Sequence, residues 1–138
     1  DKIFQTRLGL SLLSIRLTIT SVFLVWTLDK IFVPEHTVKV FSGFYGVDIS
    51  TNASIFIGSV QLIFVSMLML GLKKNVIYAL ALILHGLSTV ASFSKYLDPF
   101  NNLLFFTAWP MLAACLTLYL LREHDIYTLK IRSKKLSH

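Results

Sequence analysis

Charged residues are scarce in this chain. Only 14% of its 138 residues are Asp, Glu, Lys or Arg, against about 25% in typical soluble domains. Apolar residues make up 55% of the chain and the mean hydropathy is +0.71, which indicates a membrane protein. The net charge of +6 does not indicate nucleic-acid binding, because the basic residues lie at the ends of apolar runs, as they do in the flanks of membrane helices.

Cysteine occurs once, at Cys115, inside an apolar run. No disulfide can form within the chain, and the sequence has no CxxC motif and no Cys/His cluster with metal-ligand spacing. His85 is the single histidine within the apolar runs, which excludes bis-histidine haem ligation by this chain. We therefore expect no metal site and no cofactor bound by this chain alone, which leaves a quinone at a shared site as the candidate.

The apolar residues are concentrated in four runs, at residues 8–28, 53–72, 76–93 and 103–121. Each is close to the ~20 residues that cross a bilayer as a helix. Only residues 73–75 separate the second run from the third, so these two form an antiparallel hairpin. We predict an all-α membrane protein: one four-helix transmembrane bundle over residues 1–138, with a basic tail at 122–138.

Lysine and arginine predict the orientation of the helices. The first run is too long for a signal peptide and lacks a cleavage pattern, so we interpret it as a retained helix. Both termini are then expected in the cytoplasm, in a bacterial-type inner membrane. The residues on that side are Lys2, Arg7, Lys73, Lys74, Arg122, Lys130, Arg132, Lys134 and Lys135. The last four are candidates for contact with anionic lipid headgroups or a partner, although a positive-inside signal alone also explains them.

The first outer loop, residues 29–52, is the one long connection. Pro34 can begin a short helix there, and Val38, Phe41 and Tyr45 would share one of its faces. Aromatic residues in a polar stretch suit the membrane interface. We expect a short interfacial helix, acting as an anchor or as a lid over the outer end of the bundle.

Three polar residues interrupt the apolar runs at similar distances from the run starts. These are Arg16, Gln61 and His85, which we place near the middle of the bilayer. Thr20 shares the helical face of Arg16, and Ser88 and Thr89 share that of His85. An arginine at such a depth costs about 2.5–3.5 kcal/mol on insertion scales unless it faces protein, water or a ligand.

The fourth run contains Pro110 beside Trp109. A proline inside a helix cannot bond the carbonyl four residues earlier, so we expect a kink and a free carbonyl at Phe106 that accepts from Arg16 or His85. Trp109 is a candidate for stacking on a cation or a ring ligand. Arg16, Thr20, Gln61, His85, Ser88, Thr89 and Trp109 are thus the candidate ligand-binding or polar centre of the membrane region.

Each candidate also has a structural interpretation. Arg16 can lock the bundle by bonding Gln61, a carbonyl and hydroxyls, and this alternative stands evenly beside a ligand or proton-path role. A lone neutral histidine is more often a hydrogen-bonded interior residue than a ligand. Serine and threonine hydroxyls often join membrane helices, at about 0.6 kcal/mol each.

The run from Arg16 to Lys30 and on to Pro34 resembles the opening of the DoxX family, whose first helix carries an arginine and then a lysine at this spacing. Gln61 followed by apolar residues to Gly71-Leu72 is similar to the second helix of that family. The resemblance extends over nearly the whole chain in helix number and loop lengths. The related MauE group is also similar, but its cysteine-containing signature has no match here.

Two departures from the family accompany this resemblance. A glutamate usually occupies the place of Gln61, so the partner of Arg16 is expected to be a bound anion, a polar ligand or another subunit. Residues 118–122 replace a glycine-rich helix end. The resemblance implies a DoxX-like inner-membrane protein, often a small subunit of a quinone-reducing or other redox complex.

We therefore expect a small accessory subunit of a membrane oxidoreductase or respiratory complex. It would stabilise a partner and contribute to a quinone or lipid pocket, with Arg16 and His85 as donors and Gln61 orienting one of them. It would not be catalytic alone, since the electron source must lie on another chain. The alternatives are a stand-alone structural or assembly protein and a small transporter working as an oligomer.

Overall fold

The computed structural model describes residues 1–130, which are helical throughout apart from turns and short connections. Four helical segments in this range are long and apolar enough to cross a membrane. They are α1 (Lys2–Phe32), α3 (Thr51–Leu70), α4 (Lys74–Ala91) and the continuous segment formed by η3 (Leu103–Thr107) and α6 (Ala108–Leu120). The predicted all-α class with four helices of membrane-spanning length is confirmed.

The shorter elements lie in the connections. After α1 come α2 (Pro34–Val40) and η1 (Phe41–Tyr45), a single π-helical turn that ends at Gly46. Between α4 and the fourth segment lie α5 (Phe93–Tyr96) and η2 (Pro99–Asn101), and η4 (Arg122–His124) follows α6.

The helix boundaries differ from the apolar runs for local reasons. The helix α1 begins at Lys2, not at residue 8, because the Asp1 carboxylate caps it by accepting from the backbone N–H of Ile3 at 3.0 Å. It ends before Pro34, since the residue preceding a proline avoids helical angles. The helix α3 ends two residues early, because Gly71 adopts φ 71° and terminates it.

The fourth segment changes its helical geometry close to Pro110. Its first turns are the 3₁₀-helical η3, and α-helical geometry begins at Ala108. Pro110 is thus the third residue of α6. In the first turn of a helix the missing N–H of proline has no intrahelical role, so the residue is accommodated there without a break.

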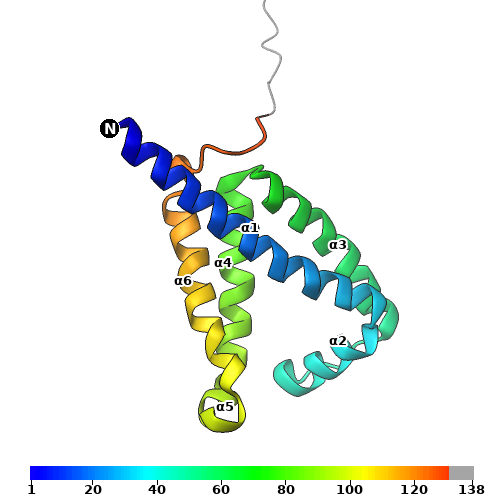
Figure 1. Cartoon of the computed structure of the whole chain (residues 1–138). Helices are drawn as coiled ribbons and strands as arrows, with labels where there is room; N and C mark the ends of the chain where they lie inside the picture. The colour runs from blue at the N-terminus through cyan, green and yellow to red at the C-terminus, as the bar shows by residue number, and fades with distance from the viewer. Residues whose placement is uncertain (131–138) are drawn as a thin grey trace, which may run out of the picture.

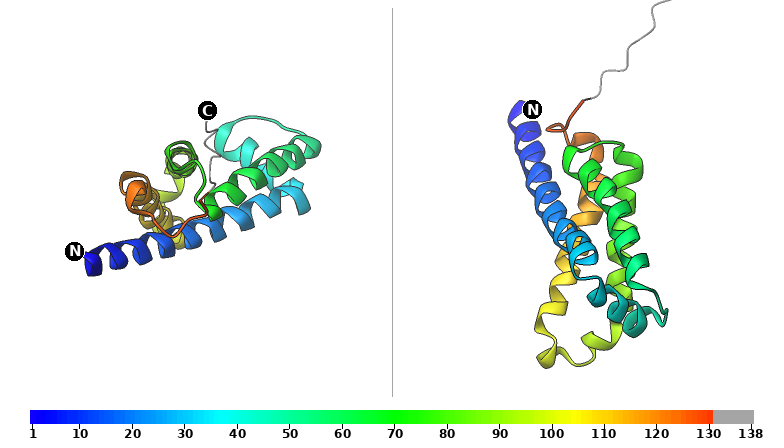
Figure 2. Two further views of the ribbon diagram at one scale, coloured as in Figure 1. Left: turned by 90° about the horizontal axis from the view of Figure 1, so that it is seen from above. Right: turned by 90° about the vertical axis from the view of Figure 1, so that its right-hand side faces the viewer.

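The long helices form two antiparallel pairs. The helix α1 packs along α3, and α4 packs along α6, with the second pair inclined to the first (Figures 1 and 2). The α3–α4 turn, the N-terminus and η4 lie toward the same end of the bundle (Figure 1). From this turn α3 and α4 diverge.

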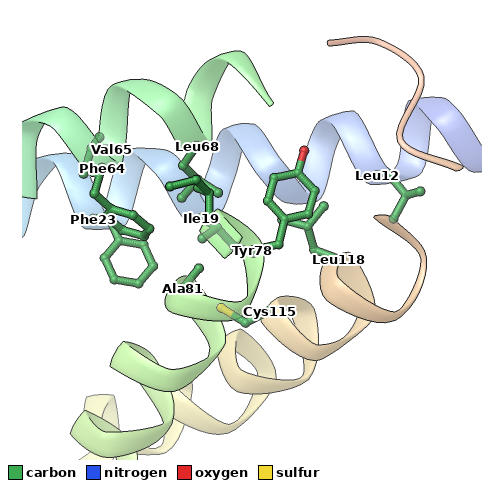
Figure 3. Close-up of a cluster of buried hydrophobic side chains, with 11 residues drawn as sticks. Leu12, Ile19, Phe23, Phe64, Val65, Leu68, Tyr78, Ala81, Cys115 and Leu118 are labelled. Carbon is green, nitrogen blue, oxygen red and sulfur yellow. The ribbon is translucent and has the colours of Figure 1, made fainter. Parts of the chain in front are cut away.

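The buried core lies where the pairs cross. Leu12, Ile19 and Phe23 of α1 meet Val65 and Leu68 of α3. Tyr78, Ala81, Cys115 and Leu118 complete it from α4 and α6 (Figure 3). The rings of Phe23 and Phe64 contribute an edge-to-face contact at 5.5 Å.

Candidate functional site

Arg16 lies at the middle of α1 with 2% of its surface exposed. All three guanidinium nitrogens donate to protein atoms. Nη1 donates to Asp125 Oδ2 at 2.5 Å, Nη2 to the Tyr127 carbonyl at 2.6 Å, and Nε to the Met69 carbonyl at 3.3 Å. The cost of burying this cation is therefore met by an ion pair and two further hydrogen bonds within the same chain.

Asp125 is the charge partner of Arg16. From the sequence we expected this partner to be a bound anion, a polar ligand or another subunit. That expectation is corrected: the partner is a residue of the C-terminal part of the same chain, and it is fully buried. Its Oδ2 also accepts from the Tyr78 hydroxyl, and its carbonyl accepts from Lys74 Nζ at 2.5 Å. Tyr78 belongs to the core through its ring, and its hydroxyl points away from the other core side chains (Figure 3).

Residues 125–129, which we term the C-terminal strap, run back across the bundle. The backbone N–H of Leu129 donates to the Leu70 carbonyl at 2.9 Å, so the strap is also joined to the end of α3. Two glycines make room for it. A Cβ on Gly71 would lie 2.3 Å from Thr128 Cγ2, and a Cβ on Gly9 would lie 2.9 Å from the Tyr127 ring. The strap is a packed part of the fold.

Sequence reasoning missed Asp125, Tyr78 and Lys74 as members of this cluster. We took the tail only as a basic segment, so its one aspartate received no role. A usable signal was present: the chain has seven acidic residues, and only Asp1, Glu123 and Asp125 lie on the side of the basic flanks. Because the next helix offers Arg16 no glutamate, these three acidic residues are its candidate charge partners.

His85 forms a second, separate cluster. Its Nε2 lies 2.8 Å from the Ala108 carbonyl oxygen and 3.3 Å from Thr89 Oγ1. Because a carbonyl can only accept, Nε2 carries the proton. Thr89 in turn donates to the His85 carbonyl at 2.7 Å. The expected acceptor, the Phe106 carbonyl, is replaced by that of Ala108.

The structure does not bring Arg16 and His85 together. Arg16 meets α4 at Tyr78 through Asp125, and His85 lies seven residues further along that helix, or about 10 Å at 1.5 Å per residue. The inclination of α1 places its middle beside the α3–α4 turn, so equal distances from the run starts do not give equal depths (Figure 1). The single polar centre that we predicted from depth is therefore wrong, and the polar residues form two separate clusters.

The remaining candidates are distributed around these clusters. The Thr20 hydroxyl donates to the Arg16 carbonyl of its own helix at 2.7 Å. Trp109 packs on Tyr96 with ring centroids 5.2 Å apart and is 48% exposed. Gln61 and Ser88 line a pocket. Lys130 is exposed, while Arg132, Lys134 and Lys135 lie outside the described residues.

The pocket that Gln61 and Ser88 line has a volume of about 410 Å³ and lies between α1, α2, η1, α3 and α4. We call it the lateral pocket. Its aromatic lining is Phe23, Trp26, Phe41 and Tyr45, and Asp29 and Lys30 are its charged residues. A cavity of 300–1,000 Å³ with a mostly apolar wall and few polar groups is typical of small-molecule sites.

His85 contacts the lateral pocket indirectly, through Trp26. The indole and imidazole rings are stacked at 6.2 Å with 23° between their planes. His85 itself is held by Ala108 and Thr89. The second cluster therefore fixes the position of an aromatic ring in the pocket wall.

Residues 34–45, which cover the lateral pocket, are held at their far end by Lys95. Lys95 Nζ lies 5.9 Å from the Phe44 ring centroid and 5.8 Å from that of Phe105, and these two rings are 6.3 Å apart. Cation–π contacts thus join η1 to α5 and η3. Residues 34–45 supply Thr37, Val40, Phe41 and Tyr45 to the pocket.

Residues 1–130 contain no group of three or more His, Cys, Asp or Glu side chains placed to hold a metal ion. Comparisons of the chain with protein-family models, with curated proteins and with solved structures give no match. The resemblance to the DoxX family therefore rests on the short motifs around Arg16, Lys30 and Gln61.

Proposed function

We propose that this protein is a small integral-membrane accessory subunit of a membrane oxidoreductase, and that its lateral pocket binds a lipid-soluble molecule with a polar ring, such as a quinone. The observation that carries the proposal is the lining of this pocket: aromatic rings on its walls, with the Gln61 amide and the Ser88 hydroxyl as hydrogen-bonding groups. A quinone offers the matching features, a flat apolar ring with two carbonyl acceptors.

The pocket favours a membrane-borne ligand because of its place in the fold. Its walls come from helices long enough to span a bilayer, and α2 and η1 cover it at one end. Gln61 is half-buried in α3 and can donate two hydrogen bonds through its amide. In this proposal Gln61 and Ser88 orient the ring, Trp26 stacks against it, and His85 positions Trp26.

Arg16 receives a structural role in this proposal. Its three nitrogens are already engaged by Asp125, Tyr127 and Met69, and it does not line the lateral pocket. In this proposal the electrons come from another chain, since the sequence has no metal, flavin or thiol motif. The DoxX resemblance and the basic flanks support association with a redox complex in a bacterial-type inner membrane, with both termini in the cytoplasm.

A stand-alone structural or assembly protein is the second candidate. The observation that favours it is the complete pairing of Arg16 within the chain, which is what a bundle-locking residue requires. The two separate polar clusters do not favour the third alternative, a transporter with one continuous polar path.

Tryptophan fluorescence tests ligand binding directly. The chain has two tryptophans, and only Trp26 lines the pocket. Trp109→Phe leaves Trp26 as the sole emitter, and Trp26→Phe leaves Trp109 as the control. We expect a short-chain ubiquinone analogue to quench Trp26 saturably and to quench Trp109 only in proportion to its concentration.

Gln61→Leu should raise the quinone concentration that gives half-maximal quenching of Trp26 about fivefold, since one hydrogen bond contributes about 1 kcal/mol. Ser59→Ala is the matched control on α3, because the Ser59 hydroxyl donates to the Ile55 carbonyl of its own helix and is exposed. Equal, non-saturating quenching of both tryptophans would refute a quinone in this pocket.

Purification in mild detergent from the native membrane tests the accessory role. We expect a haem-, flavin- or copper-containing protein to co-elute in stoichiometric amount. A chain that elutes alone with lipid would move the function to the structural alternative, whatever the pocket binds.

A further inference from the structure

A second cavity lies at the opposite end of α4 from the residues that the lateral pocket uses. It has a volume of about 380 Å³ and is lined by Lys73, Lys74, Asn75, Val76, Arg122 and Glu123. It therefore sits between the α3–α4 turn and η4, at the end of the bundle where the N-terminus also lies (Figure 1). We call it the basic cavity.

The basic cavity carries an excess of positive charge. Three of its lining residues are cations and one, Glu123, is an acid. Neither of the two ion pairs found within residues 1–130 involves Lys73, Lys74 or Arg122. Lys74 donates to the Asp125 carbonyl oxygen, which is a neutral acceptor, and the carboxylate of Asp125 is paired with Arg16. The cations thus keep a field that suits an anion.

Arg122 is held in place for such a role. Its Nε donates to Asn75 Oδ1 at 2.7 Å, its Nη1 donates to the Tyr119 carbonyl at 2.8 Å, and its guanidinium lies 4.4 Å from the Tyr119 ring centroid. All of these partners are uncharged. An arginine fixed by neutral contacts loses little side-chain entropy when it binds a phosphate.

An apolar surface leads away from the basic cavity. Val76 lines the cavity and is 59% exposed, and the exposed apolar residues Leu80 and Ile83 follow it on α4. Their spacing of four and three residues places all three on one helical face. A charged cavity at the end of a membrane-spanning helix, continuous with an exposed apolar stripe, matches the shape of a phospholipid.

We propose that the basic cavity binds the phosphate of an anionic phospholipid, whose acyl chain lies along the exposed α4 face that begins at Val76. The first residues of α4 add the positive end of its dipole to the field of the three cations. The lipid would hold η4 and the C-terminal strap against the α3–α4 turn, because Arg122 precedes the strap and Lys74 bonds it.

The test is lipid-dependent thermal stability of the purified, delipidated chain. Phosphatidylglycerol should raise the midpoint of unfolding with a saturable dependence, phosphatidylcholine should do so only at much higher concentration, and inorganic phosphate should not reproduce the effect. Lys73→Asn should raise the half-effective concentration of phosphatidylglycerol about fivefold, and Lys73→Asn with Arg122→Gln about 25-fold, if each cation near an anionic lipid contributes about 1 kcal/mol.

Lys73→Asn is chosen because it removes the charge without straining the fold. Lys73 has φ 50°, and asparagine tolerates this left-handed region better than most residues. Lys2→Gln with Arg7→Gln is the matched control, since it removes two cations at the same end outside the cavity. An equal loss of lipid response in this control would overturn the proposal in favour of general charge attraction. So would stabilisation by inorganic phosphate at the same concentration, or by phosphatidylcholine as strongly as by phosphatidylglycerol.

Discussion

The Arg16 guanidinium in the middle of α1 lies 2.5 Å from the Asp125 carboxylate, 109 positions later in the chain. Both side chains are almost fully buried, with 3% and 0% of the side-chain surface exposed. The first membrane helix is thereby tied to a segment that follows the last one. The C-terminal strap closes the bundle at this end.

Removing either member of this pair should strongly destabilise the protein. Arg16→Leu or Asp125→Asn leaves the other group buried without its charge partner, which we expect to cost about 3 kcal/mol or more of unfolding free energy. Chemical or thermal unfolding in detergent would measure it. Arg7→Leu, on an exposed turn of the same helix, is the control and should change stability by less than about 0.5 kcal/mol.

The double variant Arg16→Leu with Asp125→Asn separates pairing from packing. Because no unpaired charge remains, we expect it to be more stable than Arg16→Leu alone. Strict additivity of the two single effects would mean that the contact does not couple them.

Tyr78→Phe should also destabilise the strap, by about 1.5–3 kcal/mol, because its hydroxyl donates to a carboxylate. Tyr96→Phe is the matched control. The Tyr96 hydroxyl donates to the Thr89 carbonyl at 2.8 Å, a neutral acceptor, so we expect a loss of about 1 kcal/mol there. Equal losses for the two variants would argue against a special role for the Asp125 carboxylate.

Gly71→Ala should be harmful for two reasons that reinforce each other. Gly71 has φ 71°, and its added Cβ would lie 2.3 Å from Thr128 Cγ2. We expect a loss of at least about 1 kcal/mol in unfolding free energy. At Gly43 a Cβ meets nothing within 4 Å, so Gly43→Ala should be neutral or stabilising by up to about 1 kcal/mol. A harmless Gly71→Ala would show that the strap does not pack there in solution.

Lys95→Met should loosen the cover of the lateral pocket without unfolding the bundle. The lysine joins Phe44 to Phe105 by cation–π contacts, each of about 0.5–1 kcal/mol at exposed sites. Hydrogen exchange of residues 34–45 should become faster, while the unfolding midpoint changes little. Lys39→Met, on the exposed side of α2, removes the same charge and should leave the exchange unchanged.

The sequence alone determined the membrane class and the places of the four long helices. Both follow from properties that are local along the chain: the length of each apolar run, and the residues that begin or end a helix. The early start of α1 was readable too, since Asp1 is a capping residue, although we began the helix at the first apolar residue.

Only the tertiary structure decided which polar residues meet. Equal distances from the run starts suggested that Arg16, Gln61 and His85 share one depth, but the inclination of the α1/α3 pair to the α4/α6 pair separates Arg16 from His85 (Figure 2). Arg16 instead pairs with Asp125, because residues 125–129 fold back over Gly9 and Gly71. A contact across 109 residues depends on helix inclination and on the path of the segment after the last helix, and neither leaves a period or a motif in the sequence.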